Sequence, residues 1–284
     1  MKSVFISVFA LSVVLLQDPA DRTGSLVFVS QRSGQGDLYL MTDTGPRLFA
    51  GQDVAGEGGP RLDPARNRIV YQRFDDRGAE LVADGSILFR DPNGDTPPSW
   101  SPDGEQIAFV SADETGAHVY LAPVTNPSEA VRLTQGDVQD RYPVFSPDGA
   151  QIVFCRQTEA GWDLYRVEVA TGATDRLTSD SVFLAHPAWS PDGRYIAYDR
   201  WFDGQTELMV LDLANGETRR LTDRSGNDMA PSWSLDGSEL AFASDTTGDW
   251  ELWTLRLATG ELAQITRSPG FDGAPLYVPL DVAR

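Results

Sequence analysis

Short apolar runs with a period of two recur along the chain and are separated by turns that contain glycine. Ile-Ala-Phe or a close variant stands at residues 107–109, 152–154 and 196–198, and a further run such as Asp-Leu-Tyr at residues 163–165 follows a loop. Alternating apolar residues bounded by Asp-Gly or Asn-Gly predict short strands joined by tight hairpin turns. Four such strands make one unit, and helical periodicity is absent from the pattern after the N-terminal segment.

The units share the string Trp-Ser-Pro-Asp-Gly. It stands at residues 100–104 and 189–193 and, with one change each, at residues 145–149 and 233–237. A degenerate copy lies at residues 62–66, and a proline precedes every copy. A four-stranded repeat of about 44 residues is typical of a β-propeller blade.

Residues 23–284 hold about six such units, which predicts an all-β, six-bladed β-propeller over this range. The first unit lacks its inner strand, and residues 275–278 begin an additional copy near the C-terminus. We expect this C-terminal strand to pair with the strand at residues 26–30 of the N-terminal blade. Such pairing closes the ring and leaves no exposed sheet edge.

The Pro-x-Trp-Ser-Pro-Asp-Gly strings, with the strands that follow them, resemble the repeats of the TolB propeller family, and the resemblance covers residues from about 24 to 278. It implies an extracytoplasmic propeller that binds peptides or lipoprotein domains with the face carrying the inter-blade loops. TolB itself has an additional N-terminal α/β domain, whereas here the repeats follow the N-terminal segment almost at once. The contacts that this domain makes with inner-membrane Tol proteins are therefore not carried over.

An apolar run at residues 4–16 follows the single lysine of the chain, Lys2. It is shorter than the roughly 20 residues that a transmembrane helix needs. A basic residue before a short apolar run is typical of a secretory signal. We therefore expect a signal peptide or N-terminal anchor over residues 1–22, and a periplasmic or otherwise secreted protein without a membrane span in the propeller. The alternative is an apolar strand or buried helix of the fold.

The chain is strongly acidic, with 42 Asp and Glu residues against 23 Lys and Arg and a formal net charge of −19. Nucleic acids and anionic membrane surfaces both require a basic face, so neither is an expected partner. Cys155 is the single cysteine, and His118 and His186 are the two histidines. This composition excludes a disulfide framework and a cysteine-rich zinc site. We expect no cofactor, no metal and a monomer.

Two repeated positions are interpreted as structural. An aromatic residue opens the motif in five units, where it is expected to fill the wedge between blades. These residues are Trp100, Phe145, Trp189, Trp233 and Tyr277. An acidic residue opens the third strand of most units and an arginine stands in the fourth, which predicts exposed cross-strand ion pairs that contribute about 0.2–1 kcal/mol each.

Another acidic position lies three residues before the recurring prolines, in loops that are expected to ring the mouth of the central channel. The acids are Glu57, Asp95, Asp140, Asp228 and Asp272, and Leu184 takes the remaining position. One interpretation is an Asx-type turn in which each carboxylate accepts backbone N–H groups. The other is a negatively charged mouth that attracts a basic peptide or a cation. Acids spread around a wide ring do not converge on one calcium ion.

The loop at residues 181–187 is apolar where its neighbours are acidic. Together with the preceding loop, it is expected to bring Arg141, Tyr142, Phe183 and His186 to one side of the mouth. An apolar spot in a charged rim favours a peptide-binding hot spot. For His186 the alternative is a capping or packing role. These four residues and the five acids are the candidate binding residues, and no catalytic residue is expected.

The leading hypothesis is a non-enzymatic interaction module with a protein or peptide partner of the cell envelope. The alternative is a propeller enzyme, a lyase or hydrolase, with its active site at the acidic mouth, because similar propellers occur in polysaccharide lyases and serine peptidases. The sequence has no Gly-x-Ser-x-Gly elbow, and the equivalent acids lack the asymmetry of a glycosidase pair. A purely structural domain is the third hypothesis.

Overall fold

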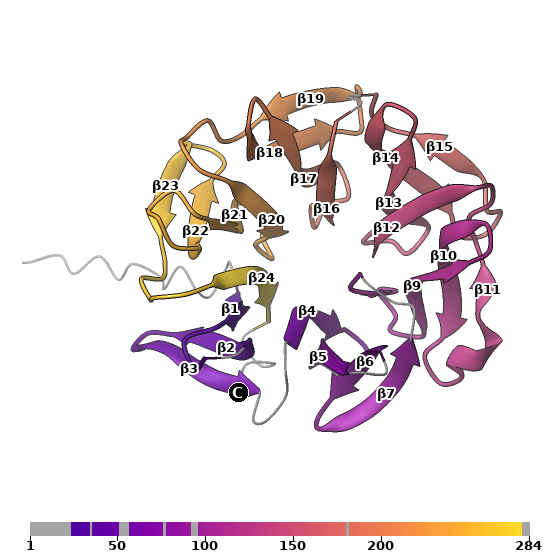
Figure 1. Cartoon of the computed structure of the whole chain (residues 1–284), viewed down its shortest axis with the longest axis horizontal. Helices are drawn as coiled ribbons and strands as arrows, with labels where there is room; N and C mark the ends of the chain where they lie inside the picture. The colour runs from indigo at the N-terminus through magenta and orange to yellow at the C-terminus, as the bar shows by residue number, and fades with distance from the viewer. Residues whose placement is uncertain are drawn as a thin grey trace, which may run out of the picture.

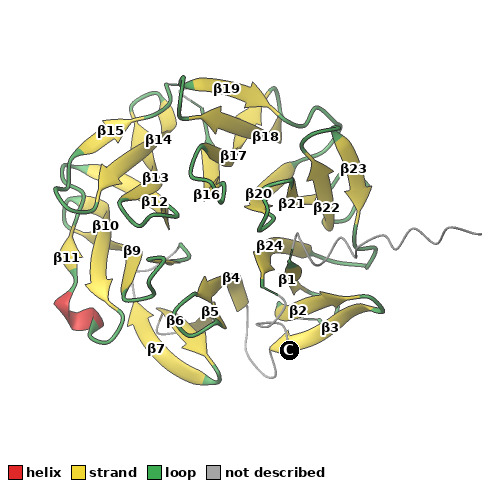
Figure 2. Cartoon of the chain, turned by 180° about the vertical axis from the view of Figure 1, so that it is seen from behind, coloured by secondary structure: helices red, strands yellow, loops and turns green. Residues whose placement is uncertain are grey.

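The computed structural model describes residues 24–34, 36–50, 57–75, 78–91, 96–179 and 182–279. Within these residues, twisted β-sheets stand side by side in a ring around a central opening (Figure 1). Helical structure in the described chain is confined to one 3₁₀ turn, η1 (Pro127–Glu129), at the outer edge of the ring (Figure 2). The predicted all-β propeller fold is confirmed, and the predicted export signal at residues 1–22 lies outside the described residues.

Four of the sheets have four strands each, and the strand nearest the central opening comes first in each of the following lists. The first sheet contains β24 (Asp272–Val278), β1 (Ser25–Ser30), β2 (Asp37–Thr42) and β3 (Gly45–Ala50). The second contains β4 (Glu57–Asp63), β5 (Arg68–Asp75), β6 (Gly78–Ala83) and β7 (Ser86–Asp91). The third contains β16 (Leu184–Trp189), β17 (Tyr195–Phe202), β18 (Gln205–Asp212) and β19 (Glu217–Arg220). The fourth contains β20 (Asp228–Trp233), β21 (Glu239–Ser244), β22 (Glu251–Arg256) and β23 (Glu261–Gln264).

The fifth sheet has eight strands in two antiparallel groups. One group contains β8 (Ser99–Trp100), β9 (Gln106–Asp113), β10 (Gly116–Pro123) and β11 (Val131–Arg132). The other contains β12 (Val138–Phe145), β13 (Gln151–Thr158), β14 (Gly161–Glu168) and β15 (Thr174–Arg176). A short parallel pairing of β10 with β12 joins them where Gly116 lies opposite Val138. Glycine is needed there, because Gly116 has φ +132° and a Cβ would lie 2.0 Å from the Val138 carbonyl oxygen.

The two ends of the described chain meet in one sheet. β24 pairs antiparallel with β1, and Tyr277 lies opposite Leu26. Leu26, Phe28 and Tyr277 form an apolar cluster with Ala241 and Leu252 of the neighbouring sheet. The backbone edge of β1 that faces the central opening is therefore covered by the C-terminal strand.

The repeated aromatic residues lie between neighbouring sheets, as expected. Trp233 packs in one cluster with Ala197 and Leu240, which belong to adjacent sheets. Its indole Nε1 donates a hydrogen bond of 3.0 Å to the carbonyl oxygen of Ala188, on the inner strand of the preceding sheet. Trp189 makes the equivalent bond one sheet earlier. Trp189 and Trp233 thus bury apolar area and satisfy their indole N–H groups between two sheets.

The Ser-Pro-Asp-Gly turns share one hydrogen-bond pattern. In the second full copy, the Ser146 hydroxyl donates to Asp148 at 2.6 Å, and the Ala150 N–H donates to the same carboxylate at 3.0 Å. Gly149 has φ +73°, a conformation that favours glycine. Equivalent Ser–Asp bonds stand at Ser101–Asp103, Ser190–Asp192 and Ser234–Asp236. The recurring string therefore encodes a self-bonded turn.

These turns predict a dependence of stability on pH. Hydrogen bonds from the serine hydroxyl and the backbone lower the pKa of Asp103, Asp148 and Asp192 below the usual 3.8. A depressed folded-state pKa stabilises the fold above the unfolded value, and this contribution is lost as the pH falls through the folded values. We expect the melting temperature to drop below about pH 4. In a triple Asp→Asn variant of these residues the drop in melting temperature should be smaller. Thermal unfolding followed by circular dichroism at several pH values measures it. An equal fall of the melting temperature with pH in the variant and the unaltered protein would contradict this prediction.

Candidate functional site

A cavity of about 610 Å³ lies along the central opening, and its walls come from the inner strands and the turns that follow them. Most of the wall is apolar, built by Pro97, Trp100, Pro102, Pro147, Pro191 and Leu235 among others. Arg61 and His186 are the lining residues that can carry positive charge. The cavity therefore combines an apolar surface with very few polar groups, an arrangement typical of small-ligand sites.

Bulges in the inner strands direct side chains toward this cavity. The register shifts between Arg141 and Val144 and between Ala185 and Ala188, and the residues at the shifts, Tyr142 and His186, have φ of 55° and 49°. A left-handed backbone costs a non-glycine residue about 1–2 kcal/mol. The corresponding positions elsewhere in the ring hold Gly59, Pro97, Ala230 and Ala274. The chain thus places its bulky polar side chains at two strained positions of the cavity wall.

Tyr142 and His186 lie against each other, with ring centroids 4.5 Å apart. His186 Nδ1 is 2.7 Å from Oδ1 of Asp199, a buried residue of β17 that also accepts the Ala230 N–H at 2.9 Å. Within the described chain, Nε2 of His186 has no hydrogen-bond partner. Asp199 therefore orients the imidazole and leaves its second nitrogen available to a ligand.

Three acids of the predicted ring, Asp140, Asp228 and Asp272, have buried carboxylates that are engaged inside the protein. Their partners are Arg156 at 2.7 Å, Arg224 at 3.0 Å and Arg32 at 2.8 Å. Burial raises the pKa of Asp228 even though Arg224 and neighbouring hydroxyls oppose the shift. The three carboxylates accept bonds from guanidinium groups, so they form neither the expected Asx-type turns nor a free negative rim.

The other ring positions differ from these three. Leu184 is buried at the start of β16. Glu57 begins β4, but its side chain lies outside the described structure, as does the whole of Asp95. The structure therefore packs Tyr142 against His186 at the central cavity, whereas Arg141 on β12 and Phe183 just before β16 are not part of the cavity lining.

An exposed aromatic patch lies beside the start of β16. Phe183, Trp201 and Phe202 are 48%, 46% and 40% exposed, and the Trp201 N–H donates to the Phe183 carbonyl oxygen at 2.8 Å. On the neighbouring β12, the Arg141 guanidinium lies 5.4 Å from the centroid of the Trp162 ring. Phe202, the next residue of β17, points to the opposite face of the strand and lies beneath the Arg220 guanidinium. We call Phe183 and Trp201, together with Arg141 and Trp162, the aromatic face. Exposed aromatic side chains on adjacent segments favour a role in binding.

The acids that open the third strands are structural, but they are not exposed as expected. Asp163 and Glu207 are fully buried. Glu207 accepts hydrogen bonds from Arg220 at 2.7 Å and from the Thr222 hydroxyl at 2.6 Å. The Thr222 hydroxyl also accepts the Leu208 N–H at 3.0 Å. Each such network joins the third strand to the end of the fourth inside the sheet. The small contribution to stability that is expected of exposed ion pairs therefore does not apply to these buried carboxylates.

Three residues at the site were not selected from the sequence: Arg61 and Gln72 line the cavity, and Asp199 orients His186. Gln72 and Asp199 share one position of the second strand, just after its aromatic or apolar run. Four other units have an apolar residue at this position: Val29, Val110, Cys155 and Ala243. A polar residue at a strand position that is apolar in the other units was the signal that could have revealed both Gln72 and Asp199.

A second, larger cavity of about 1060 Å³ lies between the β16–β19 and β20–β23 sheets. Its apolar wall includes Trp233 and Tyr195, which stack with centroids 6.4 Å apart. Its charged rim includes Asp212, which is paired with Arg194 at 2.7 Å. The central cavity, in contrast, contains a histidine that a buried carboxylate orients, and it is the better candidate for ligand binding.

Residues 178–282 match the family described as "TolB beta propeller domain" (PD40). Among solved structures, TolB from Acinetobacter baumannii is similar with a TM-score of 0.78 and 20% sequence identity, over 91% of this chain and 67% of that chain. The family match over residues 178–282 and the likeness of fold to TolB structures support the resemblance that the repeats imply. No curated protein matches the amino-acid sequence.

Two enzymes are also similar in structure. One is an oligogalacturonate lyase in complex with manganese, with a TM-score of 0.58 and 16% identity over 86% of this chain and 74% of that chain. The other is a puromycin-hydrolyzing peptidase from Mycobacterium tuberculosis, with a TM-score of 0.61 and 15% identity over 86% of this chain and 44% of that chain. At these identities the likeness shows the fold alone. In the described chain, no three His, Cys, Asp or Glu residues are grouped as metal ligands would be.

Proposed function

We propose that this protein is an extracytoplasmic, non-enzymatic interaction module that binds a protein or peptide partner of the cell envelope. The observation that carries the proposal is the aromatic face, where the exposed side chains of Phe183 and Trp201 lie on adjacent segments. Aromatic residues and arginine dominate binding hot spots, because they bury large areas and desolvate at little entropic cost. The similarity to TolB and the apolar run at residues 4–16 support a periplasmic or otherwise secreted location.

The proposal includes a monomeric ring of six blades that is closed by its two ends. The eight-stranded sheet counts as two blades in this scheme, because its two antiparallel groups meet only through the short β10–β12 pairing. The pairing of β24 with β1 supports the closure. In the described residues, no helix has the length and apolar character of a membrane span.

An enzyme with its active site in the central cavity is the second candidate function. The observation that favours it is His186, which Asp199 orients and whose Nε2 is available in the cavity. None of the lining serines in the described chain bonds to His186, because Ser146 and Ser234 donate to their turn aspartates and Ser232 accepts the Tyr277 N–H. The geometry supports an oriented binding group better than a catalytic triad.

Removal of the aromatic face is expected to abolish partner binding. The double variant Phe183→Ser and Trp201→Ser should lose at least about tenfold in affinity, since a hot-spot residue contributes about 2 kcal/mol or more. The measurement is affinity capture from an envelope extract of the source organism, followed by titration of the captured protein against the purified chain.

The matched control is Ile87→Ser, which removes a residue that is 52% exposed on β7, in a different sheet. This variant should capture the same partner as the unaltered protein. Equal recovery by the double variant and the control would show that the aromatic face is not the binding surface.

A further inference from the structure

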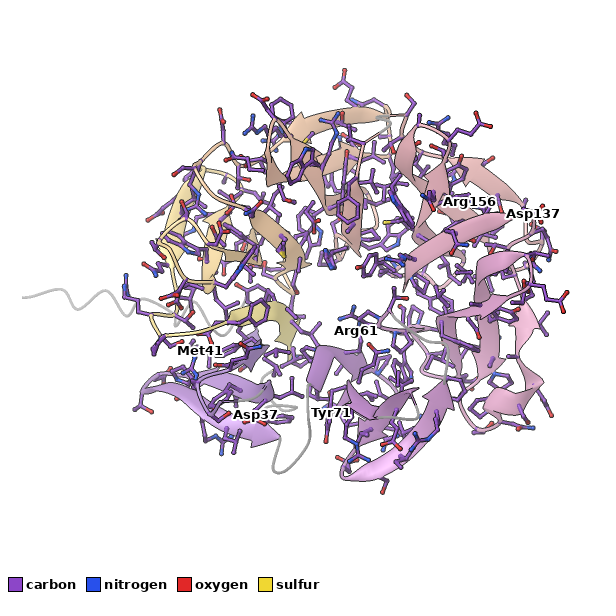
Figure 3. All side chains as sticks on the ribbon, viewed as in Figure 1. Asp37, Met41, Arg61, Tyr71, Asp137 and Arg156 are labelled. Carbon is purple, nitrogen blue, oxygen red and sulfur yellow. The ribbon has the colours of Figure 1, made fainter. Side chains whose placement is uncertain are left out.

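Arg61 lies on β4 and points toward the central opening (Figure 3). Its Nη1 donates to the carbonyl oxygen of Pro60 at 2.8 Å. The guanidinium lies beside Gly59, because a Cβ built on that glycine would be 3.3 Å from Nη1, 3.7 Å from Pro97 and 3.8 Å from Ala274. These described neighbours are small or apolar, and none of them is acidic.

Arg61 has no carboxylate partner among the described residues, although the chain holds 42 acids against 23 basic residues. Other arginines beside the inner strands pair with buried acids, as Arg156 does with Asp140 and Arg224 with Asp228. Burial lowers the pKa of Arg61 to about 10, so the group is still a cation at neutral pH. A cation enclosed by apolar walls carries a desolvation cost that an anion in the cavity would offset.

The surroundings of Arg61 define the chemistry of that anion. The cavity wall is mainly proline, tryptophan and other apolar groups, and its volume of about 610 Å³ suits a ligand of small-molecule size. A single guanidinium binds one carboxylate through two parallel hydrogen bonds and neutralises its charge, whereas a doubly charged phosphate would keep a net negative charge among apolar walls. On the same part of the wall, Trp100 Nε1 lacks the acceptor that its counterparts Trp189 and Trp233 have.

We propose that the central cavity binds a ligand with one carboxylate and an apolar body, and that Arg61 pairs with the carboxylate. The ligand is a small organic acid or the free carboxyl end of an apolar peptide. The apolar body lies against the proline and tryptophan wall, and Nε2 of His186 is available to it as a further polar contact. This site is separate from the aromatic face, so either proposal can fail while the other holds.

Calorimetric titration of the full chain with matched probes tests the proposal. The probes are octanoate against octanol, and acetyl-Ala-Ala-Pro-Phe with a free carboxyl end against its carboxamide. At least one carboxylate should bind about tenfold or more tightly than its neutral counterpart, since a charged hydrogen bond contributes about 1.5–3 kcal/mol. The tighter carboxylate identifies the source of the ligand. Equal affinity within both pairs, or no binding of either carboxylate, overturns the proposal.

Variants locate the binding. Arg61→Gln should remove the preference for the carboxylate, Arg61→Lys should retain part of it, and Gly59→Ala should weaken it because the added methyl group crowds Nη1. The matched control is Arg219→Gln, an exposed arginine at the second cavity. An unchanged preference in Arg61→Gln, or its loss in Arg219→Gln, would place the carboxylate elsewhere. The comparison of charged with neutral probes on the unaltered protein decides the question even if a variant fails to fold.

Discussion

Replacement of Asp140 by alanine is expected to lower the free energy of unfolding by about 3–5 kcal/mol, the usual cost of removing one partner of a buried ion pair. The Asp140 side chain is fully buried, and Arg156 is 12% exposed. The variant leaves the Arg156 guanidinium without its two hydrogen bonds, and it leaves the Thr134 hydroxyl without the acceptor that it reaches at 2.6 Å. Chemical denaturation followed by tryptophan fluorescence measures the change.

The control for this prediction is Asp175→Ala on β15. Asp175 pairs with Arg166 at 3.3 Å, but its side chain is 64% exposed. Exposed pairs contribute about 0–1 kcal/mol, so this variant should unfold almost as the original protein does. Similar destabilisation by both variants would show that the Asp140 carboxylate is not held in a buried pair. It would also restore Asp140 as a candidate for the binding surface.

Removal of β24 is expected to abolish cooperative folding. A chain that ends at residue 270 loses Tyr277 and Val278, which are buried, and exposes the edge and apolar face of β1. Burial of each such side chain contributes about 1.5–3 kcal/mol, and the backbone bonds to β1 are lost as well. The sum approaches the total stability of about 5–15 kcal/mol that native domains have.

The measurement is thermal unfolding together with size-exclusion chromatography, since an uncovered strand edge also favours association. The control ends at residue 279, which leaves the whole of β24 in place. It should remain monomeric and melt as the full chain does. A monomeric, cooperatively folded chain that ends at residue 270 would show that the ring does not depend on the pairing of its two ends.

The repeated sequence unit allowed the propeller fold to be predicted from the sequence. A local string such as Ser146-Pro147-Asp148-Gly149 determines a turn by bonds within a few residues, and the next strand follows with its alternating pattern. The aromatic residue before the string recurs at one register position, so its burial between sheets also follows from the pattern. These features depend on neighbours in sequence or on equivalence among repeats.

The candidate site was predicted only in part. Arg141, Tyr142, Phe183 and His186 were selected because their loops depart from the repeat, and the structure packs Tyr142 against His186 at the cavity while Arg141 and Phe183 lie outside its lining. The pairing of the three described ring acids did not follow from the repeat, because their arginine partners stand at different distances in sequence: Arg224 is four residues from Asp228, whereas Arg32 is 240 residues from Asp272. A repeated acid appears the same in the sequence whether it faces solvent or an arginine from a neighbouring strand.

The sequence by itself therefore determined the strands, the turns, the propeller class and the family resemblance, because each of these rests on short-range hydrogen bonds and on a period that packing repeats. Only the tertiary structure decided which polar groups are satisfied inside the protein and which remain available. Asp199 became the partner of His186, and Arg61 was enclosed without a carboxylate, through strand bulges and inter-sheet packing. Whether a polar group finds a partner depends on distances between groups in the folded ring. These distances cannot be read directly from positions along the chain.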